Sequence, residues 1–174
     1  MLYEIEESVR RRAKTPHELF MFNLVAFHLF MAPAAIVLDI GAYGVLLLLL
    51  PLSVIAFTWL RGRRAEKSDP WFVMAHWKLA FRRSRLLMVA YVVSGAIVSI
   101  GLWKSAGVDK QTTKTIILTI SERLAVVPAL LTVMVSFVLE SGSIYQATRG
   151  EVPDDLVKRY PAPETLQPVT PPAA

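Results

Sequence analysis

Long apolar blocks dominate this sequence and restrict its fold more than any other feature. Each block runs for about 17 to 25 residues, the length a helix needs to cross roughly 30 Å of hydrocarbon. Charged residues make up 19% of the chain and the mean hydropathy is +0.46, whereas a soluble domain carries about 25% charged residues. We therefore expect an all-α membrane protein.

Four blocks are long enough to predict transmembrane helices. The expected spans are about 18–38 and 44–60, forming a hairpin within 16–60, and about 86–103 and 117–144, forming a second pair within 86–148. The sequence Thr15-Pro16-His17-Glu18 predicts the start of the first helix, since it combines a capping residue, an N1 proline and a capping box. Gly150 predicts the end of the last helix, and Pro128 predicts a kink within it.

The segments that flank the spans predict contacts with the membrane surface. Residues 1–15 are amphipathic and basic, and residues 149–174 form a proline-rich cytoplasmic tail after one short helix at 153–159. Residues 61–85 interleave aromatic and basic side chains, which indicates an interfacial amphipathic helix before the third span. The candidate interfacial anchors are Trp71, Trp77, Lys78, Arg82, Arg83 and Trp103.

Lysine and arginine are distributed unevenly between the two sides of the predicted membrane. The N-terminal segment holds 4, the middle loop 8 and the tail 3, against 4 in the opposite loops and at their edge. Because cytoplasmic loops carry the excess of basic residues, both termini are predicted to be cytoplasmic, in a bacterial inner membrane. The same asymmetry explains the net charge of +5 and argues against nucleic acid as a partner.

The sequence contains no cysteine, which excludes disulfides, Cys-ligated zinc, Fe–S clusters and a thiol nucleophile. It also lacks a P-loop, a nucleophile elbow, a dinucleotide fingerprint and a zinc-protease motif. An enzyme is therefore the less favoured class.

His28 is the one histidine inside a predicted span. Three interpretations stay open: a structural hydrogen bond, a haem or metal ligand, and ion or proton handling. The structural interpretation is favoured, because His17 and His76 are predicted at the cytoplasmic edge, too shallow to complete a haem site with His28. No cofactor is therefore predicted, and haem is the alternative.

Other polar residues are predicted to stabilise helix pairs. Asn23 is expected to hydrogen-bond across helices. Asp39, Glu122 and Arg123 fall near the outer boundary, where Asp39 with Arg123 is the expected ion pair. Glu140 lies one turn inside the cytoplasmic end of the last span, with Arg85 or Arg82 as its expected partner.

Small residues in the second pair of spans predict close helix packing. The candidate positions are Gly95, Ser99, Ala129, Thr132 and Ser136. They can pack on each other within the chain or on a partner subunit. The favoured function is a non-catalytic accessory or structural subunit of a larger inner-membrane complex, surrounded by lipid and other membrane subunits. The alternatives are a small transporter or channel component that forms a path by oligomerisation, and a haem- or quinone-binding electron-transfer subunit.

Overall fold

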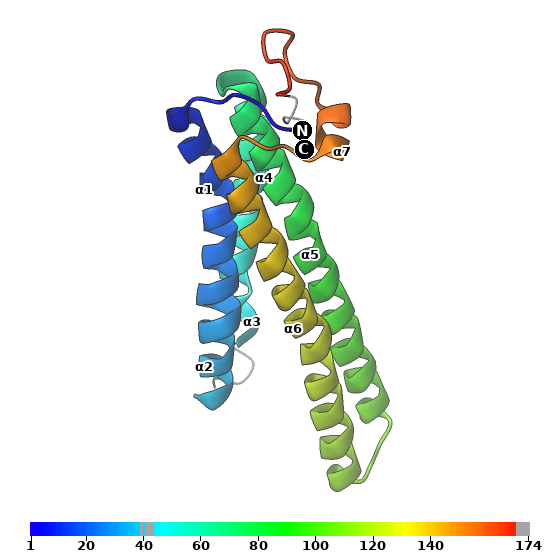
Figure 1. The fold of residues 1–174 in the computed structure, drawn as a ribbon. Helices are drawn as coiled ribbons and strands as arrows, with labels where there is room; N and C mark the ends of the chain where they lie inside the picture. Colours follow the sequence, from blue (N-terminus) through cyan, green and yellow to red (C-terminus); the bar gives the residue numbers. More distant parts are fainter. Residues whose placement is uncertain (39, 41–43, 170–174) are drawn as a thin grey trace, which may run out of the picture. The chain divides into compact units, whose positions relative to one another are not determined.

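The computed structural model is all-helical, and it describes residues 1–38, 40 and 44–169, with the side chains of residues 36 and 45 excepted (Figure 1). Its elements are α1 (Glu7–Asn23), the π-helix η1 (Leu24–Met31), α2 (Ala32–Val37), α3 (Gly44–Leu47), α4 (Leu49–Ser68), α5 (Trp71–Ala106), α6 (Gln111–Arg149) and α7 (Asp154–Arg159). Extended backbone in this part of the chain pairs only as isolated bridges, Leu2 with Glu151 and Tyr3 with Pro168.

Three helical stretches among the described residues are long and apolar enough to cross a membrane: Glu7–Ala35, Trp71–Ala106 and Gln111–Arg149. The prediction of an all-α protein with membrane-spanning helices agrees with these stretches. The predicted span at 44–60 differs, because it is divided into α3 and α4 by a turn at Leu48. Helix α4 then continues past the apolar block into the charged segment that ends at Ser68. The apolar part of α4 is therefore too short to cross a membrane by itself.

The first helix begins earlier than its capping box predicts, so that prediction is wrong. Helix α1 starts at Glu7, and Pro16 lies inside it. A proline within a helix removes one backbone hydrogen bond, and here the buried Pro16 is tolerated among tertiary contacts. Arg10, in the first turns of α1, donates a hydrogen bond to the carbonyl of Thr148 at 3.1 Å. Contacts of this kind, between residues far apart in the sequence, stabilise the helical turns that precede the capping box at Thr15.

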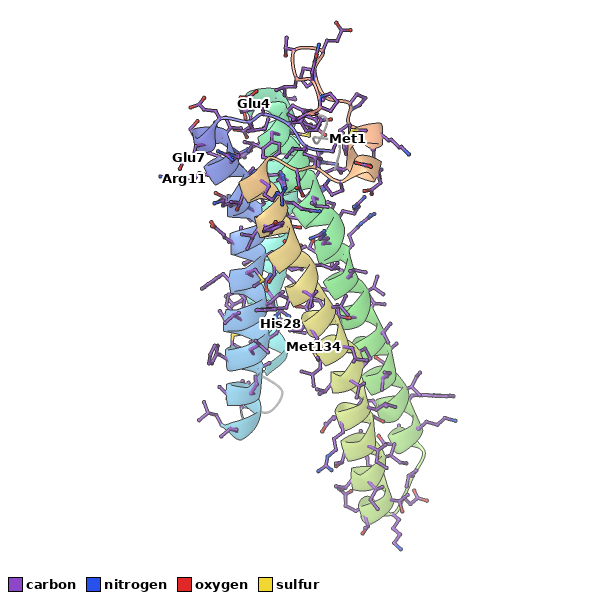
Figure 2. The ribbon with its side chains drawn as sticks, in the orientation of Figure 1. Met1, Glu4, Glu7, Arg11, His28 and Met134 are labelled. Atoms are coloured by element: carbon purple, nitrogen blue, oxygen red, sulfur yellow. The ribbon has the colours of Figure 1, made fainter. Side chains whose placement is uncertain are left out.

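The chain divides into two compact units, and the larger one contains residues Met1–Arg83 and Phe137–Ala174. Its core brings the N-terminal segment, the start of α5 and the residues around α7 together, with Tyr3, Phe72, Trp77, Leu79 and Leu156 buried. The outer side of the N-terminal segment carries exposed charged side chains, including Glu4, Glu7 and Arg11 (Figure 2).

The predicted interfacial segment packs closely against other parts of the chain. Residues 71–85 form the first part of α5 and continue directly into the apolar stretch that follows. Trp77 is buried in the core, and the Trp71 indole donates a hydrogen bond to the Tyr160 carbonyl at 2.9 Å. Lys78 forms an ion pair with Glu66. Of the aromatic side chains predicted as interfacial anchors, Trp77 is therefore enclosed by the protein, whereas Trp103 is exposed.

Gly150 ends α6 as predicted, and it also joins the two ends of the chain. Its φ of 79° is left-handed, and the Glu151 N–H returns to the Gln146 carbonyl at 2.8 Å, as in a Schellman motif. The Tyr3 N–H donates to the Gly150 carbonyl at 2.9 Å. The predicted short helix at 153–159 is present as α7. The described part of the tail continues to Val169, whose N–H donates to the Leu2 carbonyl at 2.8 Å.

The second unit, Ser84–Ser136, contains the remainder of α5 and α6 with the turn between them. Ser94 Oγ donates to the Ala125 carbonyl at 2.6 Å. A Cβ at Gly101 would overlap the Ser121 side chain, so glycine lets the two helices approach closely. Ser94 and Gly101 are seven residues apart and therefore share a face of α5.

Candidate functional site

The larger unit contains a cluster of buried ionisable side chains drawn from three helices. His17 of α1, His76 of α5 and Glu140 of α6 are each 0% exposed. Arg83 of α5 and Ser143 of α6 complete the cluster. Buried histidine and glutamate side chains on apolar helices are uncommon, and such groups mark functional positions in membrane proteins.

Helical spacing explains why these side chains meet. His76 and Arg83 are seven residues apart, about two turns, so both point from the same face of α5. Glu140 and Ser143 are three residues apart and are neighbours on α6. Phe72 lies one turn before His76 and covers its ring, with 4.7 Å between the ring centroids. The cluster is thus walled by apolar and aromatic side chains on the same helix faces.

A continuous chain of hydrogen bonds links the three buried groups. His17 Nδ1 lies 2.6 Å from Glu140 Oε2. The other nitrogen of the same ring, His17 Nε2, lies 2.9 Å from His76 Nδ1. His17 therefore bridges the carboxyl group and the second histidine, and each ring nitrogen of His17 has one partner.

Arg83 supplies the positive charge beside the carboxyl group. Its guanidinium approaches Glu140 Oε1 at 3.7 Å and donates hydrogen bonds to the Leu139 carbonyl and Ser143 Oγ. The prediction that Arg82 or Arg85 would neutralise Glu140 is wrong. One residue along a helix rotates the side chain by about 100°, so Arg83, and not its neighbours, shares the His76 face. Arg82 instead forms an ion pair with Asp155.

The predicted site residues on the first helix take part in separate contacts. The Asn23 amide donates to the Pro51 carbonyl at 3.1 Å, which is the expected hydrogen bond across helices. His28 Nδ1 lies 3.1 Å from the Asn23 carbonyl of its own helix, within η1. This contact joins the His28 side chain to a backbone carbonyl five residues earlier in the chain. His28 is half-buried, whereas His17 and His76 are fully enclosed.

The other candidate residues lie outside the buried cluster. Asp39 is outside the described residues. Glu122, Arg123 and Arg85 are exposed, and so are Gly95, Ser99 and Trp103. Of the predicted packing positions on α6, Ser136 is buried and Ala129 and Thr132 are half-buried.

The cluster is suited to holding and passing a proton. Among the described residues, no group of three or more His, Cys, Asp or Glu side chains is arranged to hold a metal ion. The ring nitrogens face each other in hydrogen bonds rather than converging on one point. Imidazole rings in such a line can exchange protons at both nitrogens.

Sequence reasoning underrated His17 and His76 because it assigned them to the membrane edge. The available signal was the spacing of Phe72, His76 and Arg83, which repeats at four and seven residues along one helix face. Comparison with known proteins adds no further constraint: no protein-family model, curated protein or solved structure matches this chain. The site is therefore defined by its geometry.

Proposed function

We propose that this chain is a four-span inner-membrane protein with both ends in the cytoplasm, acting as a non-catalytic subunit of a larger membrane complex. The proposal has two parts, the path of the chain through the bilayer and the use of its exposed helix faces. The first rests on contacts inside the larger unit, and the second on one open face of α5.

The termini support an even number of membrane crossings. The Met1 amino group donates to the Val152 carbonyl at 2.7 Å and pairs with Asp154 at 2.7 Å. Residues 152–154 directly follow the last long apolar helix. Three crossings would leave the two ends on opposite sides of the bilayer, about 30 Å of hydrocarbon apart. Their direct contact therefore favours a fourth crossing.

The α3–α4 segment is the candidate for that crossing. Near the start of α4, Pro51 accepts a hydrogen bond from Asn23, and directly after the end of α4 the Asp69 carboxylate pairs with Arg12 in the first part of α1. Arg61 pairs with the same carboxylate at 2.6 Å. These contacts fit a segment that returns antiparallel to α1. The basic residues collected at this end favour the cytoplasmic side by the positive-inside rule.

A face of α5 with small, exposed residues supports the proposal that this chain belongs to a larger complex. A Cβ built on Gly95 meets no atom within 4 Å, and Ser99 is exposed, with its hydroxyl bonded back to the Gly95 carbonyl at 2.8 Å. Ser94 and Gly101, in contrast, already contact α6. Small residues allow close approach of another helix in lipid, where association depends on packing and hydrogen bonds. Gly95 and Ser99 therefore favour a partner helix.

Affinity purification in mild detergent tests the assembly. We expect the wild-type protein to carry a stoichiometric membrane partner and Gly95→Leu to lose it. Val93→Phe should retain it, because Val93 is 41% exposed and points away from the face of α5 that holds Gly95 and Ser99. A wild-type protein that purifies as a lone monomer would refute the proposal. A visible absorption band in the pure protein would instead favour the haem-binding alternative.

A further inference from the structure

We infer that His17, His76 and Glu140 form a proton-transfer chain, with His76 as the entry point and Glu140 as the terminal acceptor. This function goes beyond membership of a complex and rests on different residues. Three observations carry it: the unbroken hydrogen-bond line, the position of its two ends, and the charge beside Glu140.

The hydrogen-bond line permits two complete arrangements of protons. In the first, Glu140 is a carboxylate that accepts from His17 Nδ1–H, and His17 Nε2 accepts from His76 Nδ1–H. In the second, Glu140 is a carboxylic acid that donates to His17 Nδ1, and His17 Nε2–H donates to His76 Nδ1. Every link is satisfied in both arrangements, and both histidines are neutral in each.

The two arrangements differ by one proton, which gives the transfer step. A proton from water binds His76 Nε2, and His76 releases its Nδ1 proton to His17 Nε2. His17 then releases its own Nδ1 proton to Glu140 Oε2. The balance is one proton gained and one carboxylate converted to a carboxylic acid, with no change in the charge of either imidazole and no other bond broken.

The entry end lies beside a residue that lines a cavity. His76 Nε2 is buried and makes no hydrogen bond within the described part of the chain. The backbone of Glu151 interacts with the His76 ring, and Glu151 also lines a cavity of about 520 Å³ together with Met1, Gln146 and Asp154. A cavity of that volume holds water.

Charged neighbours set the resting arrangement. Arg83 of α5 faces Glu140 Oε1, and Arg82 and Asp155 act electrostatically on Arg83 from α5 and α7. From α1, His17 itself faces the carboxyl group, and from α6, Ser143 accepts from Arg83. Burial favours the carboxylic acid, whereas the nearby guanidinium favours the carboxylate, so the two arrangements of protons compete and acidification favours the second.

The competing explanation is a structural latch, in which the same hydrogen bonds only hold α1, α5 and α6 together. A latch keeps one arrangement of protons at every pH at which the protein is folded. A proton-transfer chain must reverse both histidine tautomers together. The two explanations therefore differ in an observable that needs no knowledge of the partner complex.

Nitrogen NMR of the full-length wild-type protein in lipid bilayers, labelled at its histidines, separates these explanations. We expect His17 and His76 to change from Nδ1–H to Nε2–H in one shared pH step, without an imidazolium signal from either ring. The infrared band of a protonated carboxyl group should appear in the same step. His28 serves as the internal control, because its partner is a backbone carbonyl.

Two variants complete the test. Glu140→Gln removes the terminal acceptor at nearly constant volume and should abolish the shared tautomer change and the infrared band. His28→Gln should leave both unchanged. The inference is overturned if either cluster histidine becomes an imidazolium, if the two titrate at separate pH values, or if neither changes tautomer while the wild-type protein remains folded.

Discussion

Replacement of Gly150 by alanine tests how the two ends of the chain are joined. Gly150 has a φ of 79°, and a Cβ at this position would lie 2.5 Å from the Tyr3 carbonyl oxygen. The obstructing atom is backbone, so a side-chain rotation cannot relieve the overlap. The N-terminal segment must move away, and the Tyr3 N–H bond to the Gly150 carbonyl is lost with it.

The expected cost follows from these contacts. A left-handed conformation costs a non-glycine residue roughly 1 to 2 kcal/mol, and a lost backbone hydrogen bond costs about 1 kcal/mol. Alanine reduces the entropy of the unfolded chain, which returns about 0.5 kcal/mol. We expect Gly150→Ala to lower the free energy of unfolding by about 2 kcal/mol.

Equilibrium unfolding in mixed detergent micelles, followed by tryptophan fluorescence, measures this change. Gly142→Ala is the matched control, since a Cβ at Gly142 meets nothing within 4 Å inside α6. Alanine is the better helix former by about 0.5 to 1 kcal/mol, so the control should be neutral or more stable. Equal stability of the two variants would refute the proposed contact between Gly150 and the N-terminal segment.

Further predictions concern the two helix pairs and the α7 ion pair. Gly101→Ala should destabilise the second unit because its Cβ overlaps Ser121, and adding Ser121→Gly should restore it; the thermal midpoints of the single and double variants check this. Asn23→Leu should cost about 1 kcal/mol by removing the hydrogen bond from the Asn23 amide to the Pro51 carbonyl, measured by the same unfolding assay. A hydrogen bond from Arg82 lowers the pKa of Asp155. The stabilisation that this ion pair gives to the folded protein is therefore present above the ordinary aspartate pKa and is lost as the pH falls below it. Asp155→Asn should remove this part of the pH dependence of the unfolding free energy.

Apolar block length was enough to predict the helical membrane-spanning character of the chain, because bilayer thickness acts on each segment locally. Local rules also located Gly150 and α7. The start of α1 could not be predicted in this way. Its capping box at Thr15 is a genuine local signal, but the hydrogen bond from Arg10 to Thr148 joins residues far apart in sequence.

The candidate site shows the same limit more sharply. Glu140 was selected from the sequence, but its histidine partner is 123 residues away and on another helix. The positions of the apolar blocks placed His17 and His76 at the membrane edge. Such blocks show which residues are apolar, but not which helix faces pack against each other. Only the packing of α1, α5 and α6 determines that these side chains are buried together.

Site-specific labelling of single cysteines tests the proposed four-span path with both ends in the cytoplasm. The chain has no native cysteine, so Glu7→Cys, Lys67→Cys, Asp109→Cys and Glu164→Cys each give one reactive site, all at exposed positions. With an impermeant maleimide, positions 7, 67 and 164 should react only in inside-out vesicles, and position 109 only in right-side-out vesicles. Labelling of positions 7 and 164 from opposite sides would contradict the even number of crossings.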